Sequence, residues 1–181
     1  MSLFLATLLA GLFLVFVGGL LVWSHPVIGL GARALPRSSF AAGLLFGSAA
    51  GWFIWRISQL SESDLIFVQT PQPIMVGFAI LAVLAFIYTP EFLAVRGGSA
   101  LILLSAEPLL NSAYMEYQYP QRLLMVGAVY LGVCLGLYLA AAPYRVRDFF
   151  GWLFEKSARP RWLGSGLLFY GVATVIAAFT Y

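Results

Sequence analysis

Residues 3–23 read LFLATLLAGLFLVFVGGLLVW, a run of 21 residues without a single charged side chain. About 20 mostly apolar residues suffice for an α-helix to cross the hydrocarbon core of a bilayer. The run is too long for the apolar part of a secretory signal peptide, and no positive charge precedes it. It therefore predicts a membrane-spanning helix at the start of the chain.

The composition of the whole chain agrees with this prediction. Of the 181 residues, 62% are hydrophobic and only 9% are charged, whereas a soluble domain has about 25% charged and 45–50% apolar residues. So few charges cannot cover the surface of a soluble globule of this size. This excludes a soluble enzyme and a disordered segment. A nucleic-acid-binding domain is excluded as well, because the basic residues do not form one patch.

Six stretches have the length and apolarity of a membrane span. They cover residues 3–23, 39–55, 65–88, 99–114, 123–142 and 162–179. The third begins at 65 or at 73, because Pro71 and Pro73 interrupt the pattern there. Backbone groups in lipid must be satisfied within each segment, and the runs do not alternate as barrel strands do. We expect an all-α integral membrane protein, a six-transmembrane-helix bundle forming one domain over residues 1–181.

The basic residues indicate how this bundle is oriented. Six spans would place Arg56 and Arg122 on one side of the membrane. The other side would carry eight basic residues: Arg33, Arg37, Arg96, Arg145, Arg147, Lys156, Arg159 and Arg161. Cytoplasmic loops carry the excess of Lys and Arg, so both termini are predicted to be extracytoplasmic. This charge distribution suggests a bacterial cytoplasmic (inner) membrane.

The segment 145–156 has the pattern of an amphipathic helix on the cytoplasmic surface before the last span. Phe149 and Phe150 belong to an apolar stripe at helical spacing, and Arg147 and Asp148 lie away from that stripe. Such a helix lies in the plane of the lipid headgroups. It is a connector between two spans or a docking face for a partner or for anionic lipid.

Two spans carry glycines four residues apart. Gly43, Gly47 and Gly51 lie in the second span, and Gly132 and Gly136 lie in the fifth. Small residues at this spacing let helix backbones approach closely in a membrane. The pattern predicts packing within the bundle or against another subunit.

Glu107 is the one charged residue predicted inside a span, and Ser105 and Asn111 are polar neighbours along the same helix. An acid at the bilayer centre costs about 2.5–3.5 kcal/mol on insertion scales. Three interpretations stay open: a proton or cation site, an acid paired with a neighbouring group that holds helices together, or an acid in an external cleft beside a short span.

The remaining polar residues carry less information. Glu91 and Arg96, at the cytoplasmic end of the third span, are five residues apart, which is not the spacing of a good helical ion pair. The single histidine, His25, is predicted in a loop, and Cys134 is the single cysteine. We predict no metal site and no cofactor, although bound lipid is expected.

Three functions fit these observations. The first is a non-catalytic membrane subunit of a larger assembly, which binds other membrane subunits or a second copy and no nucleic acid. The second is a small-solute or ion translocating subunit that uses Glu107. The third is a membrane enzyme acting on a lipid or quinone. The sequence leans away from an enzyme, because it contains no Walker, HExxH or GxSxG motif.

Overall fold

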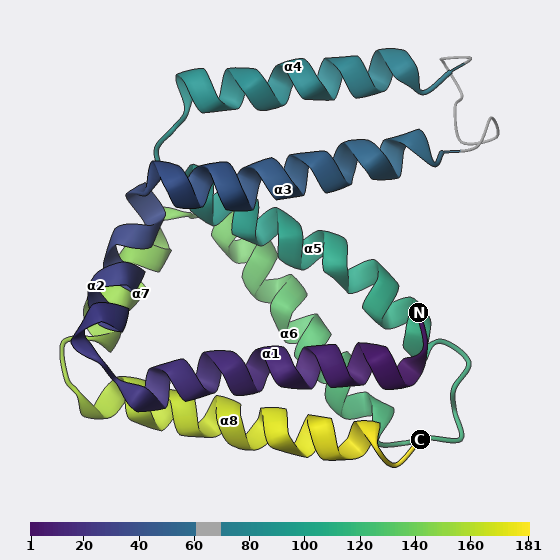
Figure 1. Cartoon of the computed structure of the whole chain (residues 1–181), viewed down its shortest axis with the longest axis vertical. Helices are drawn as coiled ribbons and strands as arrows, with labels where there is room; N and C mark the ends of the chain where they lie inside the picture. The colour runs from purple at the N-terminus through teal and green to yellow at the C-terminus, as the bar shows by residue number, and fades with distance from the viewer. Residues whose placement is uncertain (61–69) are drawn as a thin grey trace.

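The computed structural model describes residues 1–60 and 70–181, which form helices joined by short connections and contain no strand (Figure 1). The helices are α1 (Leu3–Trp23), α2 (Pro26–Ala34), a 3₁₀ turn η1 (Leu35–Arg37), α3 (Ser39–Ser58), α4 (Gln72–Tyr88), α5 (Leu93–Ala113), α6 (Arg122–Ala141), α7 (Tyr144–Leu153) and α8 (Ala158–Ala178).

Five of these helices are long and apolar enough to cross a membrane: α1, α3, α5, α6 and α8. The prediction of an all-α membrane protein is confirmed at this level. The third predicted span, over residues 65–88, corresponds to α4, which has 17 residues and is a shorter apolar helix than the other five. Most of the predicted segment before Gln72 lies outside the described residues.

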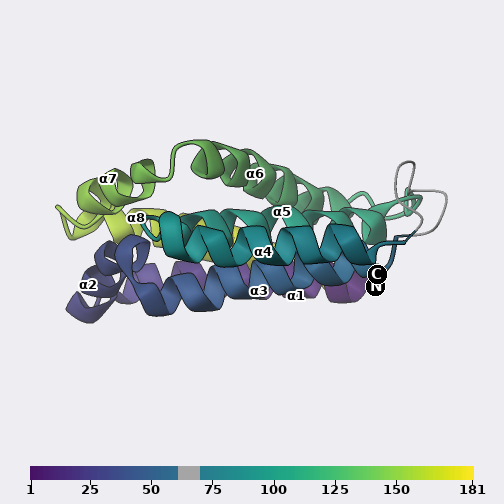
Figure 2. The same ribbon diagram turned by 90° about the horizontal axis from the view of Figure 1, so that it is seen from above.

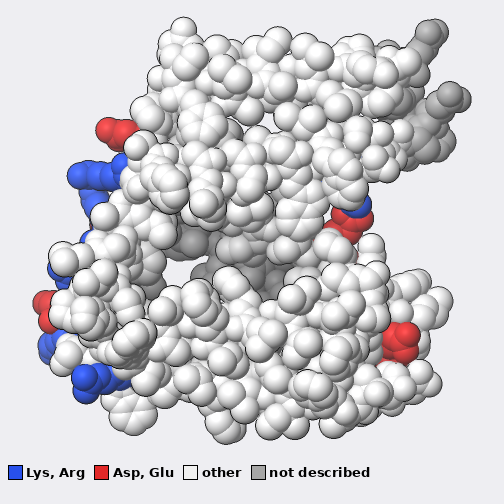
Figure 3. All heavy atoms as spheres, viewed as in Figure 1, with Lys and Arg blue, Asp and Glu red and all other residues white. Residues whose placement is uncertain are grey.

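The long helices run broadly along one direction, with α5 and α6 tilted across the others (Figures 1 and 2). The short helices α2 and α7 contact each other at one end of the molecule, across the direction of the long ones. Both chain termini lie at the opposite end (Figure 1). Most of the Lys and Arg atoms visible in Figure 3 gather at the α2–α7 end.

The most extensive contact between two described helices joins α1 to α8, the first and the last. Four glycines, spaced seven residues apart on each helix, make this approach possible. They are Gly11 and Gly18 on α1 and Gly164 and Gly171 on α8. A Cβ on Gly18 would lie 2.6 Å from the backbone nitrogen of Leu168, so only glycine fits without a shift.

A second close approach joins α5 to α3, and α5 is longer than the sequence predicts. The helix begins at Leu93 rather than at residue 99 and continues through Gly97 and Gly98. A Cβ on Gly97 would lie 2.3 Å from the backbone nitrogen of Phe46 in α3. Close packing on α3 therefore compensates for the weak helix propensity of the two glycines.

Helix α2 is an element that the sequence analysis did not identify. His25, predicted in a loop, is its N-cap, and its Nδ1 accepts a hydrogen bond of 3.4 Å from the backbone N–H of Val27. Pro26 occupies the first helical position, where a backbone N–H would have no hydrogen-bond partner within the helix, so its absence costs nothing. Helix α2 contacts α7, and its Gly29 lies beside the ring of Phe154, the C-cap of α7.

Candidate functional site

Glu107 lies in the C-terminal part of α5, six residues before Ala113. At 1.5 Å per residue this is about 9 Å from the end of the helix. Its Oε2 accepts a hydrogen bond from Nη2 of Arg56, in the last turn of α3, and the two side chains form a salt bridge. They are 53% and 42% exposed, respectively. The structure thus pairs Glu107 with a basic residue, Arg56, which lies at the end of the molecule where both chain termini are found.

The two polar residues predicted beside Glu107 have local roles. The Ser105 hydroxyl donates 2.8 Å to the carbonyl of Ile102, within its own helix. Asn111 is exposed, and its backbone carbonyl accepts from the N–H of Tyr114 at the end of α5. No hydrogen bond among the described residues joins either side chain to Glu107. The three residues share a helix but do not form a connected polar site.

Arg122, the second basic residue at the end that carries the termini, is also bound. It donates to the carbonyl of Ala113, and its guanidinium lies 4.6 Å from the ring centre of Tyr117. The two exceptions to the charge bias, Arg56 and Arg122, therefore each have a defined partner. The sequence analysis did not find these partners, because both arise from contacts between different segments.

At the same end, aromatic and hydroxyl side chains connect three segments of the chain. The rings of Tyr119 and Tyr181 meet edge to face at 5.3 Å. The hydroxyl of Thr7, which is fully buried, donates 3.2 Å to the Tyr181 hydroxyl. Gln121 donates 2.9 Å to Thr180. These contacts hold the α5–α6 connection, the start of α1 and the C-terminal residues together.

Glu91 and Arg96 are both exposed, and no salt bridge described in the structure joins them. Glu91 lies in the turn before α5, and Arg96 lies in the first turn of that helix. They belong to the end of the molecule that carries α2 and α7. The structure does not bring this predicted pair together.

The predicted packing glycines fall into two groups. Gly132 and Gly136 of α6 face α5, and a Cβ on Gly136 would lie 3.4 Å from Leu103, which is an ordinary contact distance. Gly43, Gly47 and Gly51 of α3 have no described atom within 4 Å of a Cβ position. These three glycines therefore make no close approach within the described residues.

A helix is present in the segment predicted as a surface helix: α7 covers Tyr144–Leu153 rather than 145–156, and its Val146 and Leu153 are buried. Arg147 binds the carboxylate of Asp148 through Nε at 3.1 Å and Nη2 at 3.0 Å. The apolar stripe is only partly covered, because Phe149 is exposed and Phe150 is half-buried. A hydrogen bond with the neighbouring Tyr144 side chain raises the pKa of Arg145 further above its ordinary value.

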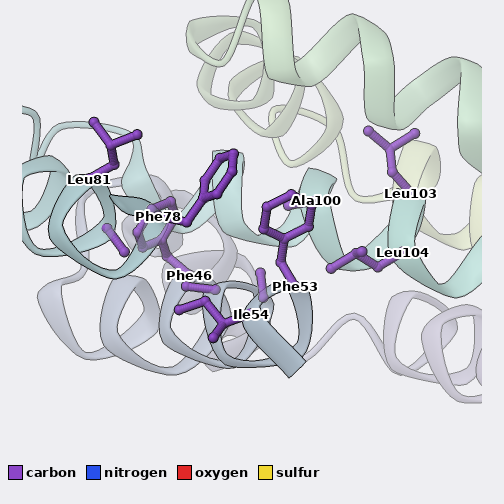
Figure 4. Close-up of a pocket in the computed structure, with 11 residues that line it drawn as sticks. Phe46, Phe53, Ile54, Phe78, Leu81, Ala100, Leu103 and Leu104 are labelled. Atoms are coloured by element: carbon purple, nitrogen blue, oxygen red, sulfur yellow. The ribbon is translucent and has the colours of Figure 1, made fainter. Parts of the chain in front are cut away.

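A groove of about 510 Å³ lies between α3, α4 and α5 (Figure 4). Phe53 of α3 and Phe78 of α4 meet there edge to face at 4.9 Å, and Leu103 of α5 lines another part. Every lining side chain is apolar. Its described lining suits hydrocarbon and presents no charged or polar side chain.

No protein-family profile, curated protein or solved structure matches the chain. Within the described residues, no three His, Cys, Asp or Glu side chains lie close enough together to hold a metal ion. A functional assignment therefore rests on the helix faces and on the few charged contacts described above.

Proposed function

We propose that the chain is a non-catalytic, multi-pass membrane subunit that packs against another membrane chain through the glycine face of α3. The observation that supports this most directly is the open row of Gly43, Gly47 and Gly51. A row of glycines over about two turns of a membrane helix is suited to close approach by another helix.

The glycines elsewhere in the same chain support this interpretation. Where α1 meets α8, and where α5 meets α3, each helix approaches a glycine so closely that a Cβ would collide with backbone atoms. Glycine lowers helix stability by about 1 kcal/mol relative to alanine. Three glycines on α3 carry that penalty with no compensating close contact among the described residues, and a partner helix would supply one.

Helix α4 leaves further surface for a partner. It has no buried residue, and its contacts within the described residues are mainly with α3. Its 17 residues would span about 26 Å, slightly less than the roughly 30 Å hydrocarbon core of a bilayer. Packing against a partner would help to accommodate a short helix at the edge of the bundle.

We further propose six spans with both termini outside the cytoplasm of a bacterial cell, in the cytoplasmic membrane. Two features support this topology. Both termini lie at one end of the molecule, as an even number of spans requires. The eight basic residues expected on the cytoplasmic side belong to the opposite end, which includes α2 and α7, in line with the positive-inside rule.

The experiment compares Gly47→Leu with Gly77→Leu. Both glycines have no described atom within 4 Å of a Cβ position, but Gly77 lies on α4, outside the glycine row. The protein is purified natively in mild detergent and its particle mass is measured. We expect the wild type and Gly77→Leu to run as an assembly, and Gly47→Leu to run at the mass of one folded chain. A wild type that is a stable monomer, or a Gly47→Leu variant that assembles normally, would overturn the proposal.

The translocating alternative has weaker support. Glu107 lies about 6 Å past the middle of α5 and is bound to Arg56, so its carboxylate is paired rather than free. Flux through reconstituted protein that disappears in a folded Glu107→Gln variant would favour this alternative. The third alternative, a lipid or quinone enzyme, has no supporting cluster of acid or base groups among the described residues.

A further inference from the structure

A second groove, of about 430 Å³, lies between α7 and the start of α8. Ligand-binding clefts have volumes of roughly 300–1,000 Å³. Trp152 of α7 and Trp162 of α8 line it, and Leu163 adds an aliphatic surface. Arg159 is the single charged residue in the lining. An apolar groove with one cation is suited to a molecule that has a hydrocarbon part and an anionic part.

The Arg159 guanidinium is held in place by hydrogen bonds that use only one of its three nitrogen atoms. Its Nη1 donates 2.6 Å to the carbonyl of Trp152 and 2.7 Å to Oε2 of Glu155, and its Cζ lies 4.6 Å from the centre of the Trp152 ring. Nη2 and Nε have no acceptor among the described residues. Guanidinium offers five N–H donors in a planar fork that matches phosphate oxygens. Arg159 therefore retains donors for a phosphate group.

Further positive charge flanks this guanidinium. Lys156 and Arg161 lie three residues before and two residues after Arg159, and both are exposed. Glu155, the one acid in this stretch, is already bound to Arg159. The groove thus lies in a positive environment, which favours a ligand with net negative charge over a zwitterionic one.

We infer that this groove binds an anionic phospholipid, with an acyl chain against Trp152 and Trp162 and the phosphate on Arg159. The position fits this ligand, because α7 has the pattern of a helix at the membrane surface and α8 enters the bilayer from it. Tryptophans concentrate at this depth, and basic clusters on the cytoplasmic side attract anionic lipids. The inference does not depend on whether the chain has a partner subunit.

The test uses the full chain in nanodiscs made with equal amounts of phosphatidylglycerol and phosphatidylcholine. Lipids retained on the protein are counted by native mass spectrometry. The wild type should retain phosphatidylglycerol in preference to phosphatidylcholine. The variant Lys156→Gln/Arg161→Gln keeps the bonds of Arg159 to Trp152 and Glu155. It should lose about fivefold in that preference for each charge removed.

Two further variants separate the groove from general surface charge. Ala158→Trp would fill the groove, since Ala158 lines it, while leaving every charge in place. It should lose the retained phosphatidylglycerol. Arg33→Gln removes an exposed basic residue of α2, at the same end of the molecule but outside the groove lining, and should behave as the wild type.

Four results would overturn the inference. The first is equal retention of the two lipids by the wild type. The second is full retention of phosphatidylglycerol by Ala158→Trp. The third is a loss in Arg33→Gln as large as the average loss per charge in the double variant, because the preference would then reflect the overall charge of the surface. The fourth is retention of neither lipid. Circular dichroism of each variant establishes that it is folded.

Discussion

Arg56 in the last turn of α3 donates a hydrogen bond to the carboxylate of Glu107 in α5, and the two charges form a salt bridge between these helices. The pair explains two features at once. Glu107 is the only charged residue inside its predicted span, and Arg56 is one of two basic residues on the side that the charge bias leaves poor in Lys and Arg. Each charge therefore has its partner in the other.

The first prediction concerns this pair. Removing one partner leaves the other charge uncompensated, so Glu107→Gln and Arg56→Gln should each lower the stability of the purified protein. Half-exposed pairs of this kind contribute about 1 kcal/mol or less. The double variant Arg56→Gln/Glu107→Gln should be less destabilised than the sum of the two single variants. Thermal unfolding in detergent measures all three.

Glu116→Gln serves as the control for these substitutions. Glu116 is also an acid at the end of the molecule that holds the termini, but its contact is a 3.3 Å hydrogen bond with the nearby Gln118 rather than a bond to another helix. Its replacement should leave the unfolding temperature nearly unchanged. Strictly additive effects in the double variant would show that Arg56 and Glu107 act independently.

The sequence identifies one half of this pair and not the other. Glu107 is conspicuous because a carboxylate in an apolar run is rare. Arg56 lies 51 residues earlier and is unremarkable at the end of a span. The partner becomes evident only when α3 and α5 are known to be neighbours, and helix adjacency is not encoded in the hydropathy of either segment.

The second prediction compares two adjacent glycines of α1. A Cβ on Gly18 would lie 2.6 Å from the backbone of Leu168 in α8, whereas one on Gly19 meets no described atom within 4 Å. Gly18→Ala should destabilise the protein by about 1–3 kcal/mol, the usual effect of overpacking. Gly19→Ala should be neutral or slightly stabilising, because alanine favours a helix. Equal unfolding temperatures for the two variants would contradict the α1–α8 packing.

The third prediction applies the same comparison to α5. A Cβ on Gly97 would lie 2.3 Å from the backbone nitrogen of Phe46, and one on Gly98 would lie 3.9 Å from a flexible atom of Leu45. Gly97→Ala must therefore push α5 away from α3, while Gly98→Ala need not. We expect the unfolding temperature to fall for Gly97→Ala alone. If α5 and α3 pack differently, the two variants will unfold alike.

The glycines show where prediction from the sequence ends. The spacing of Gly43, Gly47 and Gly51 correctly identifies residues that share one side of a helix. It does not say which side meets a neighbour, and no described atom covers this row. The glycines that join α1 to α8, including Gly18 and Gly164, are spaced seven residues apart on each helix and attract less attention in the sequence. The long apolar runs are a stronger signal, because each one alone determines a helix.

The fourth prediction concerns Tyr181, which contacts both Thr7 and Tyr119. Tyr181→Phe keeps the ring contact but removes the acceptor for the buried Thr7 hydroxyl, so it should cost about 1 kcal/mol. Tyr181→Ala removes both contacts and should cost more. Tyr114→Phe, at an exposed tyrosine of the same region, should have no effect. Thermal unfolding of the three variants measures this ranking. A Tyr181→Ala variant as stable as the wild type would contradict it.

The fifth prediction tests the proposed six-span topology. Replacing Cys134, the single cysteine, with alanine gives a background in which new cysteines can be placed one at a time. In intact cells, a membrane-impermeant maleimide should label Ser2→Cys and Tyr181→Cys from outside, and should label Ser157→Cys only after the cells are opened. If α4 does not cross the membrane, the two termini lie on opposite sides, because five spans are odd in number. Labelling of one terminus without the other would therefore refute six spans. Labelling of Ser157→Cys alone in intact cells would refute the proposed orientation but not the number of spans.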